Sequence, residues 1–194
     1  MKKLLTLLLA AFVFTACNDA KKNDGQKQPM NVELGVNDDD PNAPPPPPAV
    51  IGSAYMEDRS VSLITGGDLN TEKVWLDYVQ AHNDKNLKKI AELNHPEWEG
   101  FLPDGRTLKG TNAQMELLKT WFETSNPKWE VQWMITNDSK NEKGEMTHWL
   151  TTGNTYTDSD ADGNEILEHH IHDMEFVDGK IKKINVYSRA KTME

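Results

Sequence analysis

The chain has 194 residues and carries 21 Lys and Arg against 31 Asp and Glu, a formal net charge of −10. That length allows one ordinary domain but not two large ones. The acidic balance argues against a nucleic-acid surface, which needs positive charge, and six Trp, five Phe and four Tyr can supply a core. The single Cys excludes an internal disulfide and any multi-cysteine metal site.

The first 17 residues have the layout of a secretory signal. Lys2 and Lys3 precede an apolar stretch from Leu4 to Phe14, and small residues lead to Cys17. The segment 14–17, Phe-Thr-Ala-Cys, resembles the lipobox of bacterial lipoproteins, although Phe14 replaces the usual aliphatic residue. The resemblance implies a signal peptide over 1–16, and an acylated Cys17 that anchors the chain to a lipid bilayer. The alternative is an ordinary cleaved signal with an incidental Cys.

Localisation follows from this segment. We expect a cell-envelope protein, with the outer membrane favoured over the inner membrane. After cleavage the side-chain charge becomes 19 − 31 = −12, since Lys2 and Lys3 are lost.

Residues 17–67 are predicted to form a disordered, proline-rich tether after the acylated Cys. Their composition is dominated by Lys, Asn, Asp, Gln, Gly and Pro, and the run Pro44–Pro48 favours a stiff polyproline II segment. The alternative role for this run is a ligand for a proline-reading module. Ser60–Ile64 alternates weakly and could add an edge strand.

The folded domain is predicted over 68–194 and opens with three helices. Asn70 or Thr71 can cap the first, in which apolar residues recur at helical spacing. The second follows Asn86 and is stopped by His95-Pro96, and residues 97–110 are interpreted as a turn-rich loop. The segment 111–114, Thr-Asn-Ala-Gln, predicts a capping box that starts the third helix, which ends before Pro127.

After Pro127 the apolar period changes from 3.6 to 2, which indicates strands. We expect four of them, at 129–136, about 145–157, about 165–177 and 180–189. Asp178-Gly179 between the last two is a strong hairpin signal. The predicted fold class is therefore α+β, a curved antiparallel sheet packed against about three N-terminal helices.

The phrase at 170–181, His-Ile-His-Asp-Met-Glu-Phe-Val-Asp-Gly-Lys-Ile, resembles the nuclear transport factor 2-like superfamily and its SnoaL-like polyketide-cyclase branch. The similarity covers about residues 68–190. It implies a cone whose helices and sheet enclose a pocket, with no required cofactor. Members include isomerases, cyclases, dehydratases and binding proteins, so the fold does not choose a function. Dimerisation through the sheet face is a habit of the superfamily, so a homodimer is one expectation.

The resemblance suggests a catalytic carboxylate. Asp173 matches the His-Asp position of the family's acid/base residue, with His172 or Arg189 as its partner. An apolar pocket would raise the pKa of such a carboxylate and suit it to proton transfer beside a carbonyl. The alternative places Asp173 on the outer face of the strand.

A ligand pocket is the other site expected in the domain. The residues expected to line it are aromatic or basic, and the aromatic ones could instead be core: Tyr78, His82, Trp98, Trp121, Trp149, His170, Tyr187 and Arg189.

Two weak metal signals are present. His170 and His172 share a strand face with Glu168 and would need a third ligand from elsewhere. Asp158, Asp160 and Asp162, followed by Gly163, form the first half of a calcium loop. Its second half departs from the pattern, so an acidic hairpin turn is the alternative.

The sequence is compatible with three functions. A lipid-anchored module that binds a small apolar or amphipathic ligand is favoured over a proton-transfer isomerase or cyclase. The third is an interaction domain that dimerises without a ligand. No set of nucleophile, base and orienting residue is visible.

Overall fold

The computed structural model describes residues 45–159 and 163–190. The predicted signal peptide, Cys17 and most of the predicted tether lie outside the described residues. The elements, in chain order, are β1 (Val50–Tyr55), β2 (Val61–Gly66), α1 (Asn70–Asn83), α2 (Leu87–Leu93), β3 (Asn94–Phe101), β4 (Thr107–Lys109), α3 (Thr111–Thr124), β5 (Lys128–Lys140), β6 (Met146–Ser159), β7 (Glu165–Val177) and β8 (Lys180–Ala190).

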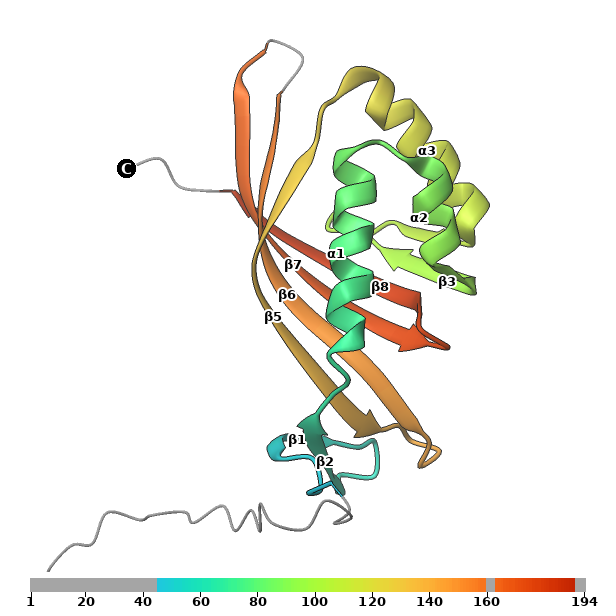
Figure 1. The fold of residues 1–194 in the computed structure, drawn as a ribbon, viewed down its shortest axis with the longest axis vertical. Coiled ribbons are helices and arrows are strands. Elements are labelled where there is room, and N and C mark those ends of the chain that lie inside the picture. Colours follow the sequence, from blue (N-terminus) through green and yellow to red (C-terminus); the bar gives the residue numbers. More distant parts are fainter. Residues whose placement is uncertain (1–44, 160–162, 191–194) are drawn as a thin grey trace, which may run out of the picture. The chain divides into compact units, whose positions relative to one another are not determined.

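The strands form one curved sheet in the order β1-β2-β5-β6-β7-β8-β3-β4. All neighbouring pairs are antiparallel except β3 and β8, which are parallel. The three helices lie together on one side of the curved strands β5–β8 (Figure 1). This arrangement confirms the α+β prediction, with a bent sheet wrapped around a helical layer.

The long strands follow the predicted period of two. β7 spans Glu165–Val177, and Asp178 and Gly179 connect it to β8 with positive φ angles of 51° and 69°. Positive φ at both turn positions matches the right-handed strand twist of a two-residue hairpin, which explains why Asp-Gly occurs here. Along β7 the even-numbered residues from His170 to Phe176 are buried and face the helices.

The first two helices form where predicted, but neither Asn70 nor Thr71 caps α1, whose N-cap residue is Leu69 with no side-chain cap. α1 covers Asn70–Asn83, and in α2 the Asn86 side chain accepts a hydrogen bond from the Lys89 backbone N–H at 3.0 Å. Asn86 therefore satisfies one of the unpaired donors at the start of α2.

Two segments of the loop predicted at 97–110 are instead strands. β3 begins directly after α2 and pairs with both β4 and β8. The prediction missed this because Pro96 and the Pro-Asp-Gly turn dominate the local pattern. Pro96 is tolerated because it lies near the start of its strand.

The predicted capping box is absent. α3 begins at Thr111 with Gly110 as its N-cap residue, at φ 80°, and no side chain caps it. Gln114, the residue expected to complete the box, is 5% exposed and turned into the core. Its hydrogen bonds to tertiary neighbours replace the local one.

Residues 50–66 form the β1–β2 hairpin and not a disordered tether, and the possible edge strand at Ser60–Ile64 is present as β2. Most of the apolar side chains of the hairpin, including Val50, Tyr55 and Leu63, are more than half exposed. Backbone pairing holds this hairpin together with little burial of side chains. It joins the main sheet through the pairs Thr65–Asp138 and Gly66–Asn137.

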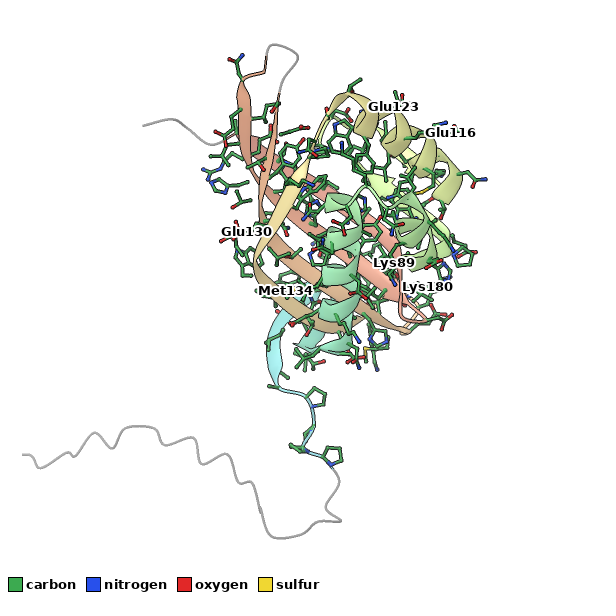
Figure 2. All side chains as sticks on the ribbon, turned by 45° about the horizontal axis from the view of Figure 1, so that its top comes forward. Lys89, Glu116, Glu123, Glu130, Met134 and Lys180 are labelled. Atoms are coloured by element: carbon green, nitrogen blue, oxygen red, sulfur yellow. The ribbon has the colours of Figure 1, made fainter. Side chains whose placement is uncertain are left out.

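The core fills the space between the helices and the inner sheet face. Ile90 of α2 and Leu150, Met174 and Ile181 of the sheet are fully buried. On the outer side of α3, Glu116 and Glu123 project toward solvent (Figure 2). Among residues 45–159 and 163–190, no helix has the length and apolar character required to cross a membrane.

Candidate functional site

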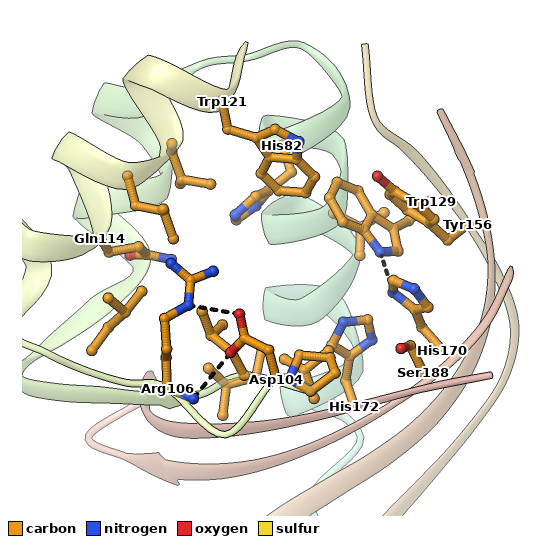
Figure 3. A pocket seen from close by; sticks show the side chains of 18 of the residues that line it. His82, Asp104, Arg106, Gln114, Trp121, Trp129, Tyr156, His170, His172 and Ser188 are labelled. Carbon is orange, nitrogen blue, oxygen red and sulfur yellow. Dashed lines mark hydrogen bonds and ion pairs between the residues drawn. The ribbon is translucent and has the colours of Figure 1, made fainter. Parts of the chain in front are cut away.

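A cavity of about 590 Å³ opens between the helices and the inner face of β5–β8. Ligand pockets typically have volumes of about 300–1,000 Å³. Its lining is mostly aromatic and aliphatic, with a few polar groups; Figure 3 shows several of its residues. Its lining residues include Trp75, Tyr78, His82, Trp98, Asp104, Arg106, Gln114, Trp121, Trp129, Tyr156, Glu168, His170, His172, Val186 and Ser188.

One stripe of α1 supplies a wall of the cavity. Trp75, Tyr78, Val79 and His82 recur at positions i, i+3, i+4 and i+7 and therefore share one helix face. The Tyr78 and His82 rings lie 4.4 Å apart between centroids.

His82 has a fixed tautomer. Its Nδ1 lies 2.9 Å from the Tyr78 carbonyl oxygen, and a carbonyl only accepts, so Nδ1 carries the proton. Nε2 then keeps its lone pair. Burial lowers the pKa of His82 to about 4, so the ring is neutral at neutral pH.

Behind the cavity wall, amide side chains orient the Tyr78 hydroxyl. Gln114 Nε2 donates to the hydroxyl oxygen at 2.6 Å, and Gln114 Oε1 accepts from Asn94 Nδ2 at 2.6 Å. Burial raises the pKa of Tyr78, so the phenol keeps its proton.

On the sheet side, His170 joins two other lining residues. Trp129 Nε1 donates to His170 Nδ1 at 3.1 Å, and His170 Nε2 lies 2.8 Å from Glu168 Oε2. Because an indole only donates, Nδ1 accepts and the proton of the neutral ring is on Nε2, which donates to Glu168. Burial lowers the pKa of His170, and the Glu168 hydrogen bond partly opposes this.

His172 lies two residues further along β7, on the same strand face as His170. Asn154 Nδ2 donates to its Nδ1 at 2.9 Å, and the Trp75 ring lies 5.0 Å away between centroids. Burial, and then the neighbouring His170 and His82, lower the pKa of His172 to about 3. The cavity thus contains three neutral imidazoles.

The two histidines, Tyr78, His82, Trp98 and Trp121 all line the cavity as the sequence suggested. Asp173 does not. Its carboxylate lies on the opposite face of β7, where Thr151 Oγ1 donates to it at 2.8 Å, and burial raises its pKa. The strand alternation that turns His170 and His172 inward turns Asp173 outward, so it has no access to the cavity.

Three further expected ligand-binding residues also lie away from the cavity. Trp149 is outward on β6, with Lys183 Nζ 5.8 Å from its ring centroid. Tyr187 is 58% exposed on β8, and Arg189 is also exposed. The same alternation explains all three, because Ile184, Val186 and Ser188 are the inward positions of β8.

The first residue of the suggested calcium loop has another role. Asp158 Oδ1 accepts from the Asn126 backbone N–H at 2.9 Å, and Oδ2 accepts from the Tyr156 hydroxyl at 2.8 Å. Asp158 therefore ties the segment after α3 to β6. Asp160 and Asp162 lie outside the described residues, and the described part of the chain contains no His, Cys, Asp and Glu group suited to a metal ion.

Several cavity residues were missed from sequence. Gln114 was assigned to a helix cap, and Trp129 and Tyr156 were used only as strand residues. Trp129 is the register partner of Tyr156, and Tyr156 is the register partner of Glu168. Register partners share a sheet face, so strand alternation could have placed Trp129 and Tyr156 on the same face as Glu168 and His170. Asp104 and Arg106, which form an ion pair at 2.6 Å, could not have been placed without the β3–β4 turn.

No family model and no curated protein matches the chain. Solved structures do match. A nuclear transport factor 2-like protein of unknown function from Burkholderia pseudomallei aligns with a TM-score of 0.52 and 14% identity, over 62% of this chain and 91% of that chain. For a ketosteroid isomerase candidate from Kribbella flavida the values are 0.50 and 12%, over 64% and 82%.

An LEH-like epoxide hydrolase of M. tuberculosis aligns at a TM-score of 0.50 and 11% identity, over 62% of this chain and 83% of that chain. At such low sequence identities these matches show similarity of fold alone. The folded part of this chain therefore has the α+β cone fold of these nuclear transport factor 2-like structures.

Proposed function

We propose that the domain binds a small, mostly apolar molecule in the cavity between α1, α3 and the sheet. The observation that carries this proposal is the cavity of about 590 Å³, whose aromatic and aliphatic walls contain a few fixed polar groups. Such a combination is typical of small-molecule sites. The wall also resists collapse, because the rings of Tyr156 and His170 stack at 4.5 Å and those of Trp121 and Trp129 meet edge-on at 5.7 Å.

Binding of the uncharged fluorescent probe N-phenylnaphthylamine tests this function. Val186→Trp fills the cavity from β8 and should weaken binding by about tenfold or more. Asn185→Trp, one residue earlier and on the opposite strand face, is the matched control and should bind normally. Equal binding by both variants would place the probe elsewhere and refute the proposal.

A second candidate function is proton transfer, favoured by the Glu168–His170–Trp129 chain within the cavity. Here Glu168, in place of Asp173, would take a proton from carbon, so that the C–H electron pair forms a C=C bond and the π pair of the neighbouring carbonyl moves to its oxygen to give an enolate. Deuterium uptake into the methyl group of acetylnaphthalene in heavy water tests it. Wild type should accelerate exchange, Glu168→Gln should not, and His169→Gln, whose side chain is outside, should behave as wild type.

Dimerisation would use the outer sheet face. Trp133, Gly153, Ile171 and Tyr187 form a row across four strands, since each is the register partner of the next. Trp133 and Tyr187 are 44% and 58% exposed. Light scattering should find a dimer that Tyr187→Lys dissociates, and a monomeric wild type would refute this role.

Membrane anchoring through acylated Cys17, in the cell envelope and with the outer membrane favoured, is the remaining part of the proposal. The sequence 14–17 supports it. Cys17→Ser should prevent labelling by a clickable palmitate analogue and release the chain from membranes. Continued membrane attachment of this variant would refute the anchor.

A further inference from the structure

Four apolar side chains share one exposed face of the β1–β2 hairpin. Strand alternation places Val61, Leu63 and Thr65 of β2 on one face, and the register pairs them with Tyr55, Ser53 and Val50 of β1. Val50, Tyr55, Val61 and Leu63 are each more than half exposed, and Tyr55 is the most exposed at 82%. We call these four residues the hairpin patch.

The hairpin patch continues the sheet face that the helices cover elsewhere. Thr65 is the register partner of Asp138, and the same row of partners runs through His148 to Phe176, which is buried beneath the helices. The hairpin extends beyond the start of α1 (Figure 1), so no helix of the described chain covers the patch. Clustered apolar side chains that remain exposed mark contact with a membrane or with another molecule.

The chain around the hairpin patch carries no charge. Residues 41–56 and 60–67 contain no Asp, Glu, Lys, Arg or His, although 27% of the whole chain is charged. Glu57, Asp58 and Arg59 occupy the turn at the end of the hairpin, where they can stay in water. The patch can therefore enter the boundary layer of a membrane without removing an ion from water.

Two physical arguments favour a lipid surface over a second copy of this chain as the partner. Copies repel each other because each has a formal net charge of −10. Four partly covered side chains also offer well under the roughly 800 Å² that each partner of a stable complex buries. A membrane contact can be weaker: only residues 18–49 separate Cys17 from β1, so the proposed acyl anchor would raise the effective concentration of the hairpin at the bilayer.

We propose that the hairpin patch contacts the surface of a zwitterionic lipid layer, with its aliphatic side chains at the boundary of the acyl chains and the Tyr55 ring among the headgroups. Tyr suits that level because its ring is apolar and its hydroxyl is polar. The contact stays at interfacial depth, since β1 is an edge strand whose outer backbone groups need polar partners. This inference rests on the proposed membrane location and specifies which surface of the fold faces the bilayer.

Site-specific fluorescence tests the contact without the acyl anchor. A histidine tag replaces residues 1–17, which keeps every described residue and removes the only Cys. Vesicles of phosphatidylcholine with a nickel-chelating lipid then hold the chain at the bilayer. Ser53→Cys carries an environment-sensitive nitrobenzoxadiazole label on the face of the patch and leaves its four side chains intact. Glu116→Cys, on the outer side of α3, carries the same label as the control (Figure 2).

On vesicles, the label at residue 53 should shift its emission to shorter wavelength and lose most of its fluorescence to nitroxide-bearing phosphatidylcholine. The label at residue 116 should do neither. Leu63→Glu puts a charge on the patch and should abolish both effects at residue 53, whereas Ser62→Glu, on the opposite strand face, should preserve them. Circular dichroism checks that both variants fold.

The outcomes separate the lipid contact from the anchor. Equal emission and quenching at residues 53 and 116 would overturn the contact. A shift at residue 53 that needs no vesicles and grows with protein concentration would also overturn it and assign the patch to a second copy. Because the tag replaces Cys17, neither result depends on acylation, and a failure of Cys17 to take up the palmitate analogue would refute the anchor alone. The contact is weak without a tether, so Cys17→Ser should still release the chain.

Discussion

At the scale of single residues, the cavity contains imidazoles that are neutral because they are buried. His82 and His172 have pKa values of about 4 and about 3, below the ordinary 6.5. A group whose pKa is lowered by folding takes up its proton first in the unfolded chain. The free energy of unfolding must therefore depend on pH below neutrality.

We expect the protein to lose stability between about pH 6.5 and pH 4, by about 1.4 kcal/mol per pH unit for each of these imidazoles. Unfolded chains bind these protons in that window and folded chains do not, so falling pH favours unfolding. Urea titrations at several pH values measure the slope. His82→Gln should reduce it, whereas His169→Gln, an exposed position on β7, should not; an unchanged slope in His82→Gln would contradict the assignment.

Two glycines each lie against a tryptophan ring, and the two rings differ in their freedom to move. A Cβ at Gly100 would lie 2.5 Å from the Trp98 ring, and a Cβ at Gly153 would lie 2.3 Å from the Trp133 ring. Trp98 is 2% exposed and enclosed, while Trp133 is 44% exposed and can move outward. The same substitution therefore has different consequences at the two sites.

Gly100→Ala should destabilise the fold by about 1–3 kcal/mol because the buried Trp98 must shift, and Gly153→Ala should have a smaller effect. Chemical denaturation of both variants, with Gly52→Ala as a control whose Cβ meets nothing closer than 3.9 Å, gives the comparison. A larger loss at Gly153 would show that the Trp133 ring is the more constrained of the two.

The sequence predicts residue pairs on one strand better than it predicts which face is inside. Strand alternation alone placed His170 and His172 together with Glu168 and separated them from Asp173. It could not show that the histidine face is the buried one, since both faces of β7 carry polar residues. The resemblance then pointed to Asp173, and tertiary packing selected the other face.

At the scale of elements, one side chain links α1 to β5. Asn83, the last residue of α1, accepts from the Trp129 backbone N–H at 2.8 Å through Oδ1 and donates to the Trp129 carbonyl at 2.9 Å through Nδ2. Lys128 Nζ also donates to the Asn83 carbonyl. The start of β5, and with it the cavity residue Trp129, is thereby fixed against the end of the helix.

Asn83→Ala should therefore destabilise the protein by about 1–3 kcal/mol. It removes both hydrogen bonds and leaves the partly buried backbone N–H and carbonyl of Trp129 without these partners. Gln80→Ala, an exposed position on the same helix, is the control. Thermal unfolding measures both variants. An Asn83→Ala variant as stable as Gln80→Ala would mean that α1 is held to β5 by packing alone.

Elements with strong local signals were predictable, and elements held by distant partners were not. α1, α2 and the four long strands follow from periodicity and from Asp178-Gly179. β3 depends on parallel pairing with β8, more than 80 residues later in the chain, and no local pattern encodes that pairing. Gln114 was misassigned for the same reason, since its partners Tyr78 and Asn94 come from other elements.

At the scale of the whole domain, Trp75, Tyr78 and Trp98 share the cavity wall because α1 packs across the sheet and β3 lies beside β8. The sequence analysis named Tyr78 and Trp98 as pocket residues. Their hydrogen-bond partners depend on tertiary structure, as the bond from Gln114 to the Tyr78 hydroxyl shows.

The β1–β2 hairpin extends this domain without building its core. It meets β5 through two residue pairs, and most of its apolar side chains are exposed. Deleting residues 45–66 from a chain that begins at residue 45 should change the unfolding free energy by no more than about 1 kcal/mol, roughly 2–4 °C in Tm. Gly67, whose N–H donates to the Thr136 carbonyl at 3.2 Å, is kept. The newly exposed edge of β5 carries Asp138, which discourages strand addition by another chain.

The shortened chain should also bind N-phenylnaphthylamine normally, because no hairpin residue lines the cavity. Loss of cooperative unfolding or of probe binding would instead make the hairpin an integral part of the fold, with the curvature of β5 dependent on it.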